Sequence, residues 1–249
     1  MGSARMRMAV AVLALLAIVA GALLWWRAGW DIAAASTNLD IIGLDDRALS
    51  ERGIRRVAMG LLEVPTGALV VADPLVQPDR PPLVRTVAPG RYAVVAYEAE
   101  GRTAVASLVL SDAPVARWEL ALIDGQDMAK LARDEYFGFP VDAGLGSIMD
   151  KAASELMLRR ESAERAKAGS GHFDYYNNVL AAELPGDGAE HIFHQPIAGN
   201  PANAAIFGSG WGDGFYPAIW GLDAEGAPTV LVTDFHVLEN GRVPELAGE

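Results

Sequence analysis

The chain has 249 residues, no cysteine, and 32 acidic against 20 basic residues, for a net charge of −12. The absence of cysteine excludes disulfides and thiol chemistry, and an acidic surface repels phosphate backbones, which argues against nucleic acid as a partner. Residues 1–30 contain three arginines and no acid, so the remainder carries a net charge of −15 and is long enough for one good-sized domain.

The first element along the chain is an apolar segment, residues 8–26, without a charged or strongly polar side chain. At about 1.5 Å per helical residue, it nearly spans the ~30 Å hydrocarbon core of a bilayer. Arg5 and Arg7 precede it, and this excess of positive charge predicts that residues 1–7 lie in the cytoplasm. We therefore predict a single-pass signal anchor that contacts the inner membrane through residues 8–26, with the bulk of the chain periplasmic or extracellular.

A cleaved signal peptide is the alternative interpretation, and it predicts a secreted protein. Small residues have the spacing of a cleavage site at 33–35 and at 20–22. The first site lies beyond Arg27 and Asp31, and the second lies within the apolar run. Because the apolar core of a signal peptide usually has only about 7–15 residues, an uncleaved anchor is favoured. Both alternatives place the rest of the chain outside the cytoplasm.

Residues 27–56 are predicted to form a juxtamembrane stalk, with a short polar helix near 45–52 that stops at Gly53. From residue 57 to residue 249, short apolar runs separated by Gly and Pro turns predict one domain built from antiparallel strands. The expected strands are residues 61–64, 68–72, 91–97, 102–110, 116–123, 190–195, 203–207, 216–220 and 228–234. This spacing predicts a mostly β, α+β fold whose antiparallel sheets form a sandwich or an open barrel.

The longest helix after the anchor is predicted over residues 147–167. Ser147 with Asp150 is compatible with a capping box, and Glu155 with Arg159 forms an i,i+4 pair in the favourable order. A second, shorter helix is expected within residues 172–184. The predicted fold is therefore one or two helices packed on antiparallel sheets, preceded by one transmembrane helix.

Aspartates at turns are the main candidates for chemistry, namely Asp73, Asp142, Asp213 and Asp234. Hard cations bind several carboxylate and carbonyl oxygens, so converging turns would create a Ca²⁺ or Mg²⁺ site or an acid–base pair. Asp is equally a standard turn residue, and the Asp142 segment lacks the last ligand of a calcium loop. No cofactor is predicted, and a divalent cation held by Asp142, Asp213 and Asp234 is the metal hypothesis that the sequence leaves open.

The histidines give a weaker signal. His191 and His194 would face opposite sides of a strand, so they are not expected to share a metal ion. His236 follows Asp234 by two positions, and on a strand both side chains would face the same way, as an acid–base pair with His236 as the base. The chain has no serine nucleophile elbow, phosphate loop, zinc-binding cysteine pair or HExxH helix, so its catalytic residues are not identified.

Aromatic side chains are dense near the C-terminus, at Trp211, Phe215, Tyr216, Trp220 and Phe235. Ligand pockets are mostly apolar with a few polar groups, and on this interpretation Trp211, Tyr216 and Trp220 line a binding site. Such a group also forms a hydrophobic core, in which buried indole N–H and phenol O–H groups find partners. Both interpretations remain open from the sequence.

Seven segments occur in the order found in a known family: residues 67–74, 89–94, 116–121, 139–144, 212–216, 220–223 and 232–235. On these segments the chain resembles the DUF4241 family of uncharacterised bacterial proteins over about residues 57–237. The resemblance implies a single domain and supplies no mechanism. The N-terminal anchor and stalk are additions to the simplest members of the family.

Three functional hypotheses follow. The first is a membrane-anchored binding or interaction module with a protein partner, one form of which is protection against a basic partner, as an immunity protein provides. The second is a metal-dependent or acid–base hydrolase that uses Asp142, Asp213 and Asp234, with His236 as a base. The third is a structural component of the envelope. The missing catalytic signatures favour the first.

Overall fold

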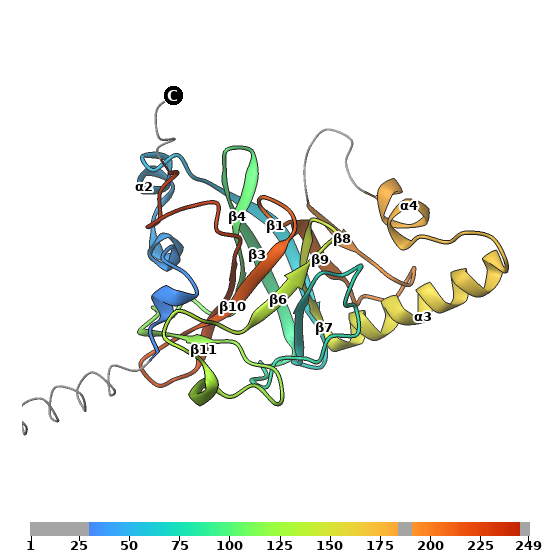
Figure 1. Cartoon of the computed structure of the whole chain (residues 1–249), viewed down its shortest axis with the longest axis horizontal. Helices are drawn as coiled ribbons and strands as arrows, with labels where there is room; N and C mark the ends of the chain where they lie inside the picture. Colours follow the sequence, from blue (N-terminus) through green and yellow to red (C-terminus); the bar gives the residue numbers. More distant parts are fainter. Residues whose placement is uncertain (1–29, 184–190, 245–249) are drawn as a thin grey trace, which may run out of the picture.

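The computed structural model describes residues 30–183 and 191–244, and it shows an α+β fold dominated by two antiparallel sheets (Figure 1). The larger sheet has the strand order β1 (Arg55–Val64), β3 (Gly90–Ala99), β4 (Arg102–Val109), β11 (Pro228–Asp234), β10 (Gly214–Leu222) and β5 (Arg117–Leu120), with β6 (Gly138–Val141) paired to β10. The smaller sheet has the order β2 (Leu69–Ala72), β7 (Leu145–Asp150), β9 (Ala204–Gly208) and β8 (His191–His194). The predicted antiparallel, mostly β architecture is confirmed.

The two sheets pack against each other, because β1 contacts β7 and β8 while β4 contacts β9. Their facing side chains form one hydrophobic core, to which the larger sheet contributes Val94 and Leu108 and the smaller sheet contributes Ile148 and Phe207. This is the sandwich, rather than the open barrel, of the two predicted arrangements. The predicted strands are present with shifted ends, whereas β6 and β7 were not predicted.

The segment before residue 57 corrects the predicted stalk. Its described part, residues 30–56, includes the helix α2 (Asp46–Ser50) and two 3₁₀ turns, η1 (Ile32–Ala34) and η2 (Leu39–Gly43). Apolar side chains from these elements and the residues between them are buried in the main core, namely Ala35, Leu39, Ile41, Leu49 and Ile54. Burial of apolar surface stabilises the folded state, so this segment is an integral part of the domain.

The predicted anchor, residues 8–26, lies outside the described residues. Within residues 30–183 and 191–244, no helix is long and apolar enough to cross a membrane.

The long helix begins later than predicted. Residues 147–150 form the end of β7, and the helix α3 spans Lys151–Ala168. Asp150, and not Ser147, caps it by accepting a hydrogen bond from the backbone N–H of Ala152 at 2.8 Å. The Ser147 hydroxyl instead donates to the carbonyl of Ala72 across the sheet at 2.8 Å. The second predicted helix is reduced to the short α4 (Tyr175–Asn178) and the 3₁₀ turn η4 (Leu180–Ala182).

The turn after β1 carries the chain from one sheet to the other. β1 pairs with β3, whereas β2 pairs with β7, so the two neighbouring strands do not form a hairpin. The fully buried carboxylate of Asp150 holds this crossing, because it accepts the backbone N–H groups of Thr66 and Gly67 and the Thr66 hydroxyl. One side chain therefore fixes both the crossing and the start of α3.

A glycine allows the two sheets to approach closely where β1 bulges. The pairing register between β1 and β3 shifts between Ala58 and Gly60, and Gly60 has φ +150°. A Cβ atom at Gly60 would lie 2.8 Å from the ring of Phe193 on β8. The bulge thus places Phe193 under β1, at the edge of the cleft described below.

We expect Asp150→Ala to lower the free energy of unfolding by about 3 kcal/mol, because it leaves several buried donors without an acceptor and removes a helix cap. Chemical unfolding of the full-length chain, followed by tryptophan fluorescence, measures this change. The matched control is Asp45→Ala, which removes the exposed cap of α2, a carboxylate that accepts one hydrogen bond from the Ala48 N–H, and should cost clearly less. Equal losses in both variants would contradict the role assigned to Asp150.

Candidate functional site

The structure separates the aspartates that the sequence grouped. Asp142 and Asp213 are neighbours, because β6 pairs with β10 through Val141 and Gly214, and both carboxylates are exposed. Asp234 ends β11 and is completely buried. Among the described residues, no group of three or more His, Asp or Glu side chains is arranged to hold a metal ion. The expected convergence of these three carboxylates is therefore not found.

Asp73 and Asp234 have structural partners. Asp73 is fully buried and accepts the backbone N–H groups of Leu75, Val76, Asp142 and Ala143. Asp234 accepts a 2.5 Å hydrogen bond from the Ser36 hydroxyl and a 2.9 Å bond from the Asn38 amide. The Asp234 carboxylate thus fastens the N-terminal segment to the end of β11, which matches the turn interpretation of these aspartates.

The backbone N–H of His236 donates to the Asp234 carboxylate at 2.9 Å, but the His236 imidazole is not hydrogen-bonded to it. β11 ends at Asp234, and His236 has φ +54°, so the predicted alternation along one strand is wrong. Its Nδ1 lies 4.0 Å from Asp234 Oδ2, beyond hydrogen-bonding distance, and its Nε2 lies 3.2 Å from the Tyr136 hydroxyl oxygen. That hydroxyl already donates to the Phe215 carbonyl at 2.7 Å, so Nε2 carries the proton in the neutral ring. This arrangement does not supply the Nε2 lone pair that a base requires.

The predicted aromatic group divides into core and surface. Trp220 and Phe235 are 2% and 0% exposed, and Tyr216 is 5% exposed, so Trp220 and Tyr216 are core residues and do not line an open pocket. Trp211 and Phe215 are 58% and 46% exposed. The core interpretation holds for the first three side chains, and the binding interpretation is open only for Trp211 and Phe215.

We define the aromatic surface as Tyr136, Trp211, Phe215 and His236. The rings of Tyr136 and Phe215 stack with centroids 5.8 Å apart, and the Tyr136 and His236 rings are 5.9 Å apart. Tyr216 joins the two sides, since its ring is 5.9 Å from that of His236 and its hydroxyl donates to the carbonyl of Gly212, next to Trp211. The loop between β9 and β10 packs closely against Phe235, since a Cβ atom at Gly210 would lie 2.9 Å from that residue. Gly210 also has φ +66°, which favours glycine.

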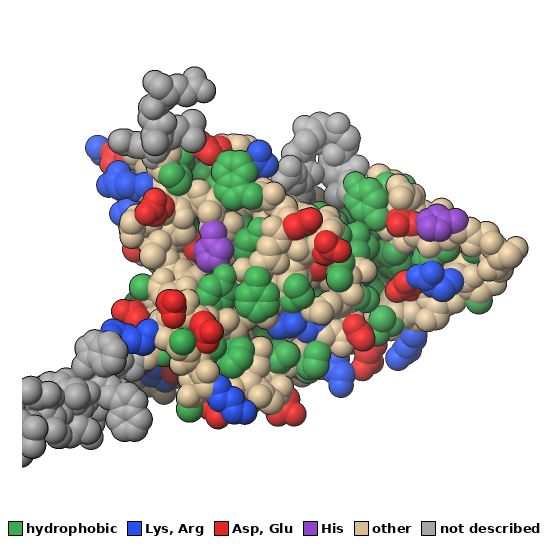
Figure 2. Space-filling model, viewed as in Figure 1, with side chains coloured by type: hydrophobic (Ala, Val, Ile, Leu, Met, Phe, Trp, Pro, Cys, Tyr) green, Lys and Arg blue, Asp and Glu red, His purple; other side chains and the backbone are tan. Residues whose placement is uncertain are grey.

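Four acidic residues adjoin the aromatic surface, together with two cations, Arg102 and Arg133. Asp134, Glu135, Asp142 and Asp213 are exposed and adjoin it in the chain or across the β6–β10 pair. On the face shown in Figure 2, hydrophobic side chains gather in the middle of the molecule, with Asp and Glu side chains nearby. Burial, and secondarily Asp213, raises the pKa of Tyr216, and burial followed by the charges of Asp234 and Tyr216 raises the pKa of Tyr136. Both phenols therefore stay neutral at physiological pH.

Strand β8 separates His191 and His194 as predicted, with His191 half-buried on one face and His194 fully buried on the other. His194 Nδ1 lies 2.7 Å from Glu183 Oε2, and its Nε2 lies 2.8 Å from the Tyr175 hydroxyl oxygen. A carboxylate only accepts, so Nδ1 donates to Glu183 and Nε2 accepts from Tyr175. Burial raises the pKa of Tyr175 to about 12 and lowers that of His194. The hydrogen bond between the neutral Tyr175 and His194 side chains holds α4 on β8, and neither side chain is an activated nucleophile.

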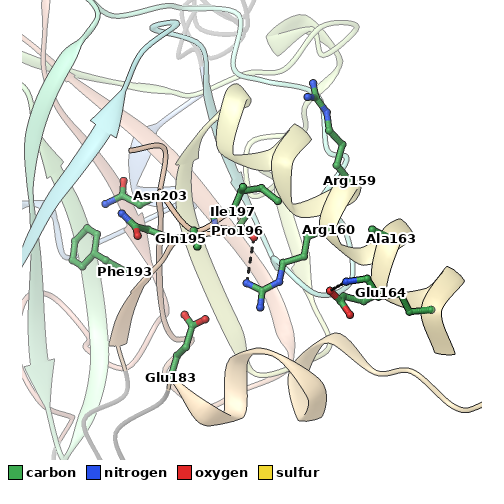
Figure 3. A pocket seen from close by; sticks show the side chains of 12 residues that line it. Arg159, Arg160, Ala163, Glu164, Glu183, Phe193, Gln195, Pro196, Ile197 and Asn203 are labelled. Atoms are coloured by element: carbon green, nitrogen blue, oxygen red, sulfur yellow. Dashed lines mark hydrogen bonds and ion pairs between the residues drawn. The ribbon is translucent and has the colours of Figure 1, made fainter. Parts of the chain in front are cut away.

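A cleft of about 850 Å³ lies between α3 and β8 (Figure 3). The walls come from α3, from the residue after η4, from β8 and from the segment between β8 and β9. The residues are Arg159, Arg160, Ala163, Glu164, Lys167, Glu183, Phe193, Gln195, Pro196, Ile197, Ala198 and Asn203. Three cations and two carboxylates face it, on a chain whose net charge is −12. Sequence analysis missed this cleft, although the adjacent pair Arg159–Arg160 within a predicted helix was visible.

Fold and surface together define a two-sheet antiparallel domain with a long helix and without an assembled metal or nucleophile site among its described residues. Residues 62–233 match the model of the family described as "Protein of unknown function (DUF4241)". Because the match covers more than half of the chain, the protein belongs to this family, as the resemblance indicated. No curated protein and no solved structure matches the chain.

We expect His194→Gln to reduce the loss of stability that the protein suffers on acidification. Burial holds the pKa of His194 below its ordinary value of 6.5, so the unfolded chain binds this proton more readily. The loss of folding free energy caused by His194 begins as the pH falls through about 6.5, and it is complete below the pKa of His194 in the folded state. Unfolding midpoints of the full-length chain between pH 5 and pH 8 measure it. His172→Gln, at an exposed position, is the control, and identical pH profiles for wild type and His194→Gln would refute the prediction.

Proposed function

We propose that this protein is a membrane-tethered binding module that holds a basic protein partner on the aromatic surface. The observation that carries the proposal is the exposed Trp211 ring, which already holds the guanidinium of Arg102 at 4.3 Å from its centroid. Exposed aromatic rings bind cationic side chains through the negative face of the ring. Tyr136 and Phe215 extend this surface beyond the internal Arg102 contact.

The charges around the surface favour a basic partner over other occupants. The carboxylates of Asp134, Glu135, Asp142 and Asp213 would pair with lysine and arginine side chains at the rim of an interface. The same charges disfavour an anionic lipid surface, even though aromatic rings also favour membrane interfaces. Protein interfaces usually have aromatic side chains in the centre and charged side chains at the rim.

The proposed tether is the apolar segment of residues 8–26. The described chain begins next to the aromatic surface, since the indole N–H of Trp30 donates to the carbonyl of Glu135 at 2.6 Å. A membrane anchor before Trp30 would therefore hold the domain with this surface near the bilayer. A basic partner at the outer face of the membrane is the protein that such an arrangement would capture.

We expect Phe215→Ser to abolish recovery of a basic partner when the full-length chain is used as bait in solubilised membranes. Added salt should weaken the wild-type complex, because it screens the rim charges. The matched control is Tyr176→Ser, which changes an exposed aromatic ring on α4 and should leave recovery unchanged. Recovery that is equal in Phe215→Ser and wild type, or no partner above background, would overturn the proposal.

Deletion of residues 8–26 should move the chain from the membrane pellet to the soluble fraction. In wild-type cells with permeabilised outer membranes, added protease should digest the domain while a cytoplasmic marker survives. A shortened wild-type chain in the soluble fraction would support the secreted alternative instead. An intact domain that resists the protease would place it in the cytoplasm and contradict both predictions.

A further inference from the structure

The cleft between α3 and β8 is lined by more cations than carboxylates, although the whole chain is acidic. α3 carries five Lys or Arg residues and three Glu residues, although acids outnumber bases by 32 to 20 in the whole chain. Arg160, Glu164 and Lys167 follow each other at helical spacing on one side of α3. They line the 850 Å³ cleft and also a second hollow of about 460 Å³ beside α4. A cationic helix face thus stands between two recesses.

Arg160 has N–H donors within the cleft that are not used in the described structure. Figure 3 shows its guanidinium reaching from α3 into the space beside Pro196 and above Glu183, while Arg159 projects in another direction. Its hydrogen bond in the described structure goes from Nη1 to the Pro196 carbonyl at 3.2 Å. A guanidinium has five N–H donors, so most of them remain available for an anion. The other cations are paired, Lys167 with Glu164 at 2.7 Å and Arg159 with Glu155 at 3.8 Å.

The opposite wall is apolar and partly exposed. Phe193 is half-buried at the bulge of β1, whereas Ile197, which is 39% exposed, lies nearer α3, with Gln195 between the two (Figure 3). Gln195 makes no hydrogen bond in the described residues, so its amide is also free to meet a ligand. Small-molecule sites combine apolar walls with a few convergent polar groups, and the volume of this cleft falls in their usual range of roughly 300–1,000 Å³.

We propose that this cleft binds a small carboxylate with an apolar body. The carboxylate would accept two hydrogen bonds from the Arg160 guanidinium, whose fork geometry matches it. The apolar body would point away from α3 toward Phe193, with Gln195 at its edge. The net positive charge of the lining selects an anion, and Glu183 on the far side disfavours a ligand with several negative charges. The proposal is independent of the partner proposed for the aromatic surface.

Three probes with the same fluorophenyl body, similar size and different charge test the proposal. They are 4-fluorophenylacetate, 4-fluorophenylacetamide and 4-fluorophenethylammonium, each titrated against the full-length chain and observed by ¹⁹F NMR line broadening. We expect the anion to bind at least about tenfold more tightly than the other two, which is the worth of one charge-assisted hydrogen bond. Arg160→Gln should abolish this preference. Arg165→Gln removes a helix charge that does not line the cleft and should preserve it.

Three results of these titrations would overturn the proposal. Equal binding of the three probes, or a preference that survives Arg160→Gln, overturns the proposal. Equal loss in Arg160→Gln and Arg165→Gln would show only a general attraction to α3 and also overturns it. Gln195→Ala checks the result in a variant that leaves the Arg160–Pro196 hydrogen bond in place, and it should weaken the anion without removing its preference. Phe215→Ser should not change probe binding, which distinguishes this proposal from that for the aromatic surface.

Discussion

Three buried aspartates accept hydrogen bonds from backbone and side-chain donors that would otherwise be buried without a partner. Asp150 fixes the crossing between the sheets, Asp73 binds the turn that follows β6, and Asp234 receives the N-terminal segment through Ser36 and Asn38. An unpaired buried donor costs free energy comparable to a lost hydrogen bond. The crossing after β1, the start of α3 and the attachment of residues 30–44 therefore depend on side chains that the folded state cannot replace with water.

The sequence suggested that turn aspartates form a metal or acid–base site, whereas in the structure the buried ones accept hydrogen bonds that hold the fold together. An aspartate at a turn has one appearance in the sequence whether it binds a cation, a substrate or the backbone of its own loop. Burial and partners decide between these roles, and both depend on residues far away in the chain, such as Ser36 for Asp234. For this reason Asp142 and Asp213 could be placed in turns from sequence, while their separation from Asp234 could not.

Elements with a clear pattern were predictable, and elements without one were not. β3, β4 and β11 have apolar runs between turn residues, so their positions followed from the sequence. β7 is buried on both faces and lacks the alternation of a half-exposed strand, and it ends on the cap of α3, so it was assigned to the helix. The N-terminal segment failed for a related reason, since 3₁₀ turns place apolar residues at spacings that fit neither period.

The two proposed sites have opposite electrostatic character and are built from different elements. The aromatic surface lies on loops that adjoin β6, β10 and β11, beside the Trp30 contact, with acids at its rim. The cleft lies on α3, which extends away from the N-terminal segment toward the other end of the molecule (Figure 1). The cleft and the aromatic surface share no residue, so a ligand proposed for the cleft would leave the aromatic surface uncovered.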